Sequence, residues 1–203
     1  MPSDLRAEFG DIDIYLFDQL LRGRITKPAR VLDAGCGGGR NLVYLMREGF
    51  DLWAIDDDEG AIEDVRRQAR TLAPHLPADR FTVQPVERMS FPSAAFDIVI
   101  SSAVLHFARD EPHWWTMVHA MGRVLAPDGI LFARLASTIG IEGRVSPLGD
   151  RRFVLPDGST RFLVDEAMLL RATDELRGEL LDPIKTTVVQ NTRSMATWVL
   201  RKP

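Results

Sequence analysis

Residues 31–41 read VLDAGCGGGRN, and this stretch decides the fold of the chain. An apolar run that ends at Ala34 predicts a strand, and apolar residues of helical period follow from Asn41. Glycines between a strand and a helix let backbone amides approach a ligand at the helix N-terminus, where the helix dipole favours negative groups. Such glycines can also serve tight geometry alone, so the turn by itself is weak evidence of a ligand site.

Strands and helices alternate after this turn. Residues 51–56 and 96–102 are expected to be strands, and the second is almost wholly apolar, as is typical of a strand buried on both faces. Helical spacing of apolar residues predicts helices near 59–72 and 112–125. Such alternation predicts an α/β fold with helices on a mostly parallel sheet. The other expected elements are strands at 29–34, 81–86, 130–135, 180–190 and 194–201, and helices at 12–21, 41–48 and 164–173.

The length of the chain, 203 residues, fits a single domain. The amphipathic segment 12–21 predicts a cap helix within an N-terminal piece, residues 1–28. Residues 137–163 are rich in glycine and proline, and we expect an irregular excursion over the cleft that closes in a hairpin around 156–159. The gap between the last two strands is short, so these strands are expected to be antiparallel.

The amino-acid composition limits which kinds of partner the chain is expected to bind. Basic side chains number 25 and acidic ones 29, for a net charge of −4, so duplex nucleic acid is disfavoured as a partner. We expect no membrane contact, because no apolar stretch reaches the roughly 18 residues of a bilayer span. The start of the chain lacks the features of a signal peptide, so a cytoplasmic location is predicted. Cys36 is the one cysteine, and the histidines show no metal-ligand spacing, so we expect no metal.

Asp56 ends the second expected strand, twenty-one residues after Gly35. Parallel topology would bring its carboxylate beside the glycine turn, where it could accept hydrogen bonds from the two hydroxyls of a ribose. Helix capping or solvation stays open for Asp56, since Asp57 and Asp58 follow it. The third glycine of the nicotinamide pattern G-x-G-x-x-G is replaced by Arg40, and no phosphate-loop lysine follows, so we expect a nucleoside ligand without a pyrophosphate.

Asp33 to Gly39, D-A-G-C-G-G-G, resembles the first motif of the class I S-adenosylmethionine-dependent methyltransferases. Residues 54–56 resemble the family's ribose-binding strand end, 91–97 its approach to the fourth strand, and 123–129 its turn before the fifth. The similarity covers about residues 30–136. Within the family, Gly37, Gly39, Arg40 and Asn41 with the following Tyr44-Leu45 resemble the small tellurite-resistance type.

The resemblance implies a Rossmann-like, doubly wound sheet of seven strands, mostly parallel with the last strand antiparallel. It also implies S-adenosylmethionine as cofactor, at the carboxyl ends of the first, second and fourth strands. A small-molecule acceptor would receive the methyl group by direct displacement, and we expect a monomer or a homodimer. The implied cofactor contacts are Asp33, Gly35, Gly37 and Gly39 at the methionine end, Asp56 at the ribose, and Asp57, Val86 and Glu87 at the adenine. Tyr15, Cys36, Asn41 and Ser101 complete the expected cofactor site.

Two of these assignments leave alternatives. Pro85 stands where relatives often carry an aspartate, and it has neither an amide hydrogen nor a carboxylate, so the adenine amino group needs Glu87 or a main-chain carbonyl. Tyr15 lies on the cap helix, where relatives often fold an aromatic ring over the cofactor. A half-buried tyrosine without that contact is an equally open interpretation.

Direct displacement chiefly requires that the acceptor be aligned with the methyl group and that water be excluded. A base matters only if the acceptor must lose a proton, and His106 is the best-placed candidate, although it could instead line the pocket. Cys36 sits where the fold needs a small residue, so we do not expect a nucleophile there. The expected acceptor contacts are Phe107, Trp114, Arg134 and Arg144, with core packing open for Trp114. Arg144, Arg151, Arg152 and Arg161 would favour an anionic acceptor.

Two other functions remain open at the level of sequence. A noncatalytic module could bind S-adenosylmethionine, because the displacement needs no invariant base. A nicotinamide-dependent oxidoreductase is less favoured because of Arg40.

Overall fold

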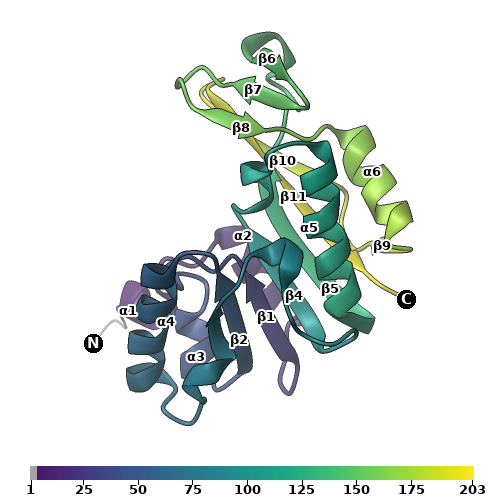
Figure 1. The fold of residues 1–203 in the computed structure, drawn as a ribbon. Coiled ribbons are helices and arrows are strands. Elements are labelled where there is room, and N and C mark those ends of the chain that lie inside the picture. Colours follow the sequence, from purple (N-terminus) through teal and green to yellow (C-terminus); the bar gives the residue numbers. More distant parts are fainter. Residues whose placement is uncertain (1–3) are drawn as a thin grey trace.

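The computed structural model describes residues 4–203, and its main sheet lies between two layers of helices (Figure 1). The strands of this sheet are β1 (Arg30–Ala34), β2 (Asp51–Asp56), β3 (Phe81–Val83), β4 (Phe96–Ser102), β5 (Leu125–Ala136), β9 (Glu179–Leu180), β10 (Lys185–Val189) and β11 (Arg193–Arg201). Seven of them follow the order β10-β11-β5-β4-β1-β2-β3, and the short β9 pairs with β11 off this path.

The pairing confirms the expected fold class. Strands β3, β2, β1, β4 and β5 are parallel, and β11 runs antiparallel between β5 and β10. The chain leaves β1 toward β2 on one side and reaches β4 on the other, so the strand order reverses at β1. Ligands of open α/β sheets bind at this kind of reversal, beyond the carboxyl ends of the strands.

Within residues 4–203, six α-helices accompany the sheet, and Figure 1 shows helices on both of its faces. They are α1 (Leu5–Phe9), α2 (Ile14–Leu21), α3 (Val43–Arg47), α4 (Glu59–Leu72), α5 (Glu111–Val124) and α6 (Glu166–Glu175). One core cluster joins α2, α3 and α4 to the sheet, and a second joins α5 and α6 to the opposite face. The predicted cap helix corresponds to α2.

Aspartates fix where five of these helices begin. The side chains of Asp4, Asp13, Asp58, Asp110 and Asp165 accept hydrogen bonds from backbone amides in the first turn of α1, α2, α4, α5 and α6, respectively. Such caps satisfy amides that have no partner within the helix.

The expected strand at 180–190 is divided in the structure. Strand β9 ends at Leu180 and β10 begins at Lys185, with Pro183 between them. Proline has no amide hydrogen for the ladder, which explains the interruption. The prediction of one continuous strand was therefore wrong.

Residues 137–163, where the sequence predicted an irregular excursion closing in a hairpin, contain a second sheet of three short strands. Strands β6 (Ser146–Gly149), β7 (Arg152–Val154) and β8 (Thr160–Phe162) pair antiparallel, and the expected hairpin at 156–159 joins the last two. Strand β6 is exposed along its whole length, so no apolar alternation marks it in the sequence. The segment follows β5 and rises above the carboxyl edge of the main sheet (Figure 1).

None of the helices within residues 4–203 combines the length and the apolar character that crossing a bilayer requires.

Candidate functional site

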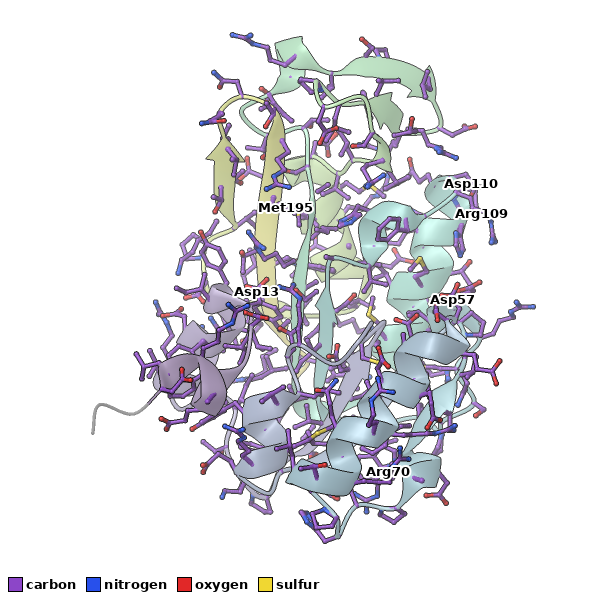
Figure 2. The ribbon with its side chains drawn as sticks, turned by 90° about the vertical axis from the view of Figure 1, so that its left-hand side faces the viewer. Asp13, Asp57, Arg70, Arg109, Asp110 and Met195 are labelled. Atoms are coloured by element: carbon purple, nitrogen blue, oxygen red, sulfur yellow. The ribbon has the colours of Figure 1, made fainter. Side chains whose placement is uncertain are left out.

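A cavity of about 670 Å³ opens at the carboxyl ends of β1, β2 and β4. Its volume lies within the range of about 300 to 1,000 Å³ that is usual for small-molecule sites. The lining residues are Gly35, Cys36, Gly37, Gly38, Arg40, Asn41, Asp56, Asp57, Pro85, Val86, Glu87, Ser102, Ala103, Val104, Phe107, Arg109, His113 and Met117. Two of the lining residues, Asp57 and Arg109, are labelled in the right-hand part of Figure 2. We refer to this space as the first cavity.

The glycine turn forms one wall of the first cavity, and its geometry requires glycine. Gly35 has φ +86°, and a Cβ atom there would lie 2.4 Å from Cγ2 of Val104. Gly39 has φ +80°, and its Cβ would lie 2.9 Å from Cγ2 of Val65 in α4. Gly39 therefore serves the packing of the turn on α4 and does not line the cavity, so the expected cofactor contact at Gly39 is not seen.

Asp56 is held at the end of β2 by two backbone amides. Its Oδ2 accepts a hydrogen bond from the amide of Gly37 at 2.8 Å, and its Oδ1 accepts one from the amide of Asp58 at 3.0 Å. Asp58, and not Asp56, caps α4. These bonds confirm that Asp56 lies beside the glycine turn, and they leave free lone pairs on both oxygens for a ligand in the cavity.

Asp33 is buried behind this wall and, like Gly39, does not line the cavity, and its carboxyl oxygens are unpartnered within residues 4–203. The side chain is 1% exposed, and neither oxygen finds a hydrogen-bond partner among residues 4–203. Burial raises the pKa of Asp33 to about 7, the nearby Asp56 adds to the rise, and Arg40 opposes it. Buried polar groups are nearly always paired in native proteins, so this carboxyl is suited to a cationic group brought by a ligand.

The opposite wall carries the residues expected at an adenine. Val86, Glu87 and Asp57 line the cavity together with Pro85. Glu87 Oε1 lies 3.4 Å from Nε2 of His113, a residue of α5 that the sequence did not single out for this cavity. Glu87 thus lies near His113, and it remains the candidate hydrogen-bond acceptor for the amino group of an adenine.

Cys36 lines the cavity as a protonated thiol. Burial raises its pKa far above the usual range, and the carboxyls of Asp33 and Asp56 raise it further. A thiol of raised pKa yields little thiolate, so Cys36 is no nucleophile. Ser101 is buried behind the cavity wall and does not line it, so the expected contact of Ser101 with a cofactor is not seen.

Asp13, which sequence reasoning missed, lines neither cavity but is bonded to three residues that do. It is 3% exposed, and its Oδ2 accepts hydrogen bonds from Ser102 Oγ and from a guanidinium nitrogen of Arg134, each at 3.1 Å. Its own amide donates to Oδ1 of Asn41 at 3.0 Å. Asp13 also caps α2 through the amide of Tyr15. The capping position before a helix was its one signal in the sequence, and the partners come from β4, β5 and the glycine turn.

A second cavity, of about 330 Å³, adjoins the first. Its lining residues are Ala103, His106, Arg134, Ala136, Leu155, Asp157, Ser159, Arg161, Val189, Arg193 and Met195. Ala103 lines both cavities and has φ +66°, a left-handed conformation that is costly for a residue with a side chain and is often found at functional sites. Figure 2 shows Met195 above the level of Asp13 and Asp57, toward the excursion.

His106 lines this second cavity and is neutral at pH 7. Burial lowers its pKa to about 4, and the positive charge of Arg161 contributes to the decrease. The side chain is 8% exposed, and within the described chain its Nδ1 has no hydrogen-bond partner.

Three residues expected to contact a ligand line neither cavity. Tyr15 lies outside the first cavity, because its hydroxyl bonds to Thr187 and its ring packs on Arg134 at 5.0 Å. Trp114 lines neither cavity, because its ring is fully buried in the core beside Phe162. Arg144 is exposed and lines neither cavity.

Two other expected acceptor contacts do line a cavity. Phe107 lines the first cavity and lies under the guanidinium of Arg161, 5.1 Å from it. Arg134 lines the second cavity. Of the four arginines expected to favour an anion, Arg161 alone lines a cavity, and Arg151 instead forms ion pairs with Glu111 and Asp165.

Comparisons with known proteins agree with this architecture. The model of the methyltransferase domain family matches residues 32–133. A ubiquinone biosynthesis O-methyltransferase from Methylocella silvestris is 31% identical over 80% of this chain and 65% of its own length. The chain spans less than half the length of other curated relatives that it matches.

Two solved structures illustrate the similarity of fold. A SAM-dependent methyltransferase from Methanosarcina mazei has a TM-score of 0.74 at 20% identity, over 90% of this chain and 96% of that one. A 1,6-didemethyltoxoflavin-N1-methyltransferase from Burkholderia thailandensis, solved with bound 1,6-didemethyltoxoflavin and S-adenosylhomocysteine, has a TM-score of 0.70 at 19% identity, over 98% of this chain and 81% of that one. At these identities the structures show the fold alone, and the narrower resemblance to the tellurite-resistance type stays a prediction. With the family model matching half of its residues, the chain belongs to the class I S-adenosylmethionine-dependent methyltransferases.

Proposed function

We propose that this chain binds S-adenosylmethionine in the first cavity and transfers its methyl group to a small-molecule acceptor. The observation that carries the proposal is Asp56, a carboxylate fixed by the amides of Gly37 and Asp58 at the cavity wall, with Asp33 unpartnered nearby. One carboxylate suits a ribose diol, and the other suits the ammonium group at the methionine end. When bound, the cofactor would supply an electrophilic methyl group on a positively charged sulfur.

The residues of the chain would chiefly bind and orient. Asp56 would accept hydrogen bonds from the ribose hydroxyls, and Asp33 would pair with the ammonium group once it has lost its own proton. Val86 and Glu87 would contact the adenine. Alignment of this kind can lower a barrier by about 7 to 11 kcal/mol without any catalytic triad.

His106 remains the candidate base for an acceptor that must lose a proton. Its imidazole is neutral and its Nδ1 lacks a partner in residues 4–203, so it can accept a hydrogen bond from an acceptor in the second cavity. A pKa of about 4 makes it a weak base, which suits orientation of the acceptor better than complete removal of its proton.

Isothermal titration with S-adenosylhomocysteine tests the cofactor site. We expect binding to the wild-type chain and an affinity at least tenfold lower for Asp56→Ala, since hydrogen bonds to a charged group are each worth about 1.5 to 3 kcal/mol. Asp79→Ala is the matched control, because Asp79 is exposed and lines neither cavity. Unchanged affinity in Asp56→Ala would refute the assignment of the site.

Two measurements separate the proposal from its rivals. A ligand present at 100 times its dissociation constant should stabilise the protein by about 2.7 kcal/mol. Stabilisation by a nicotinamide dinucleotide and not by S-adenosylhomocysteine would favour the oxidoreductase. Continuous transfer of radiolabelled methyl to an extractable product would exclude the noncatalytic module. A cytoplasmic location and a monomeric or homodimeric state are further parts of this proposal.

A further inference from the structure

The second cavity contains more positive than negative charge. Arg134, Arg161 and Arg193 line it, against the single carboxylate of Asp157. Oδ1 of Asp157 already accepts hydrogen bonds from the amide and the hydroxyl of Ser159 at 2.9 and 2.6 Å. Only Oδ1 of this carboxylate is engaged in the turn, but a single carboxylate cannot neutralise three guanidinium groups.

Two of these arginines form no close ion pair within residues 4–203, although, after the hydrogen bonds from Ser159, the charges of Arg161 and Arg193 help to lower the pKa of Asp157. Arg134 forms an ion pair with Asp13 at 3.1 Å. Arg161 donates to the carbonyl of Thr160, and neither it nor Arg193 forms an ion pair with any carboxylate in the described part of the chain. A guanidinium has five N–H donors in a planar fork that matches a carboxylate, so unused donors remain at this cavity.

Buried polar atoms without partners also line the cavity. Nδ1 of His106 and Nε of Arg134 are both shielded from solvent, and neither has a hydrogen-bond partner within residues 4–203. His106 is more than nine-tenths buried. Groups left unsatisfied in this way cost free energy, which a polar ligand in the cavity would recover.

The rest of the wall is apolar. Ala136, Leu155, Val189 and Met195 come from β5, the hairpin, β10 and β11, and they line the cavity together with the arginines. A ligand with a charged end and an apolar body matches both parts of such a wall. The volume of about 330 Å³ limits that ligand to a small molecule.

The second cavity also lies where an acceptor has to be. Ala103 belongs to the linings of both cavities, and Arg161 packs on the ring of Phe107, which lines the first. A molecule anchored among the arginines can thus reach the boundary with the cofactor cavity. We propose that the methyl acceptor is a small carboxylic acid with an apolar body, anchored in the second cavity by Arg161 and Arg193. This inference rests on the proposed function and names the substrate class of the same site.

Titration calorimetry on the full chain saturated with S-adenosylhomocysteine tests the proposal. The probes are benzoate, phenylacetate and hexanoate, each paired with its uncharged amide. We expect at least one acid to bind ten or more times as tightly as its amide, because a guanidinium recognises the carboxylate by charge-assisted hydrogen bonds. Arg161→Gln and Arg193→Gln should each weaken that acid about fivefold or more, and leave the amide unchanged.

Arg144→Gln is the matched control, since Arg144 lies in the same excursion but lines neither cavity, and it should bind the acids like the wild type. Affinity for S-adenosylhomocysteine should stay within twofold in all three variants, which also shows that each is folded. The proposal is overturned if every amide matches its acid, or if Arg161→Gln and Arg193→Gln both bind the acids like the wild type. Failure of the wild-type chain to bind S-adenosylhomocysteine would instead refute the proposed function.

Discussion

Asp33 and Asp56 lie at the same end of the cleft, but their surroundings differ. Asp56 accepts two amide hydrogen bonds, whereas Asp33 is buried with no hydrogen-bond partner in the described residues. Burial moves the pKa of Asp33 to about 7, so the free protein holds a proton there over much of the physiological range. A ligand that brings an ammonium group has to displace this proton.

This proton predicts a pH dependence of cofactor binding. An ammonium group selects the ionised form of Asp33, so affinity for S-adenosylhomocysteine should rise about tenfold between pH 6 and pH 8 and then level off. Titration calorimetry at pH 6, 7 and 8 measures the change, and at pH 6 the binding should release a proton to the buffer. Asp33→Asn should bind weakly at all three values. A wild-type affinity that is constant with pH would contradict the role of Asp33.

His106 predicts an effect on stability. Its folded pKa of about 4 lies below the unfolded value of about 6.5, so the unfolded chain binds more protons in this interval. Stability is therefore lost as the pH falls through this interval, by about 2 kcal/mol for this group between pH 7.5 and pH 5. Urea unfolding of the wild type and of His106→Gln at both pH values isolates the contribution, because Asp33 and the other groups are common to both. An equal loss in the two proteins would show that His106 is not buried as described.

Some individual residues of the site could be predicted from the sequence. Asp56 and Gly35 were found because a local motif and parallel topology together fix their positions. Tyr15 and Trp114 were misplaced, since the direction of a side chain on a helix depends on what the helix packs against. Asp13 had no motif, and its partners are far away in the sequence.

Among the elements, α2 connects the N-terminal region to the cleft through one residue. Asp13 caps the helix, accepts hydrogen bonds from Ser102 and Arg134, and holds Asn41 through its amide. A single residue thereby joins α2 to β4 and β5 through its carboxylate, and to Asn41 beside the glycine turn through its amide. The position of the helix and the shape of the first cavity are therefore coupled.

Asp13→Ala should lower the free energy of unfolding by about 2 kcal/mol or more. The variant loses a helix cap, worth about 1 kcal/mol, and leaves Arg134 and Ser102 without their buried partner. Asp58→Ala is the control, because Asp58 caps α4 on the exposed surface and should cost only about 1 kcal/mol. Urea unfolding followed by circular dichroism compares the two. Equal losses would show that the contacts of Asp13 beyond its cap contribute nothing.

Regular elements were easier to predict than irregular ones. The predicted bounds 51–56, 59–72 and 96–102 agree with β2, α4 and β4, because these elements carry long apolar patterns. Strands β6 to β8 have three or four residues each and little burial, so their pairing depends on the hairpin and on contacts made after folding. No local pattern could have predicted them.

Across the whole molecule, the two cavities are built by different parts of the chain. No residue of 137–163 lines the first cavity, whereas Leu155, Asp157, Ser159 and Arg161 line the second. The ends of this segment lie together, since the amide of Thr138 donates to the carbonyl of Val164 at 2.8 Å. The segment should therefore be removable without separating its neighbours.

Replacement of residues 140–161 by a short glycine-serine linker should retain cofactor binding and abolish acceptor binding. Affinity for S-adenosylhomocysteine should stay within about threefold of the wild-type value, because every residue of the first cavity is kept. The acids that bind the wild type should no longer be detected by calorimetry. A loss of S-adenosylhomocysteine binding in a variant that still unfolds cooperatively would contradict this separation of the two cavities.

The separation also bears on how such a protein diversifies. The glycine turn allows almost no substitution, because a side chain at Gly35 would collide with Val104. The hairpin at 156–159 is exposed for most of its length, and it contributes to the wall of the second cavity alone. Mutations in this hairpin can alter which acceptor molecules bind without changing the residues that bind the methyl donor. A new acceptor specificity can therefore arise from exposed substitutions that cost little stability.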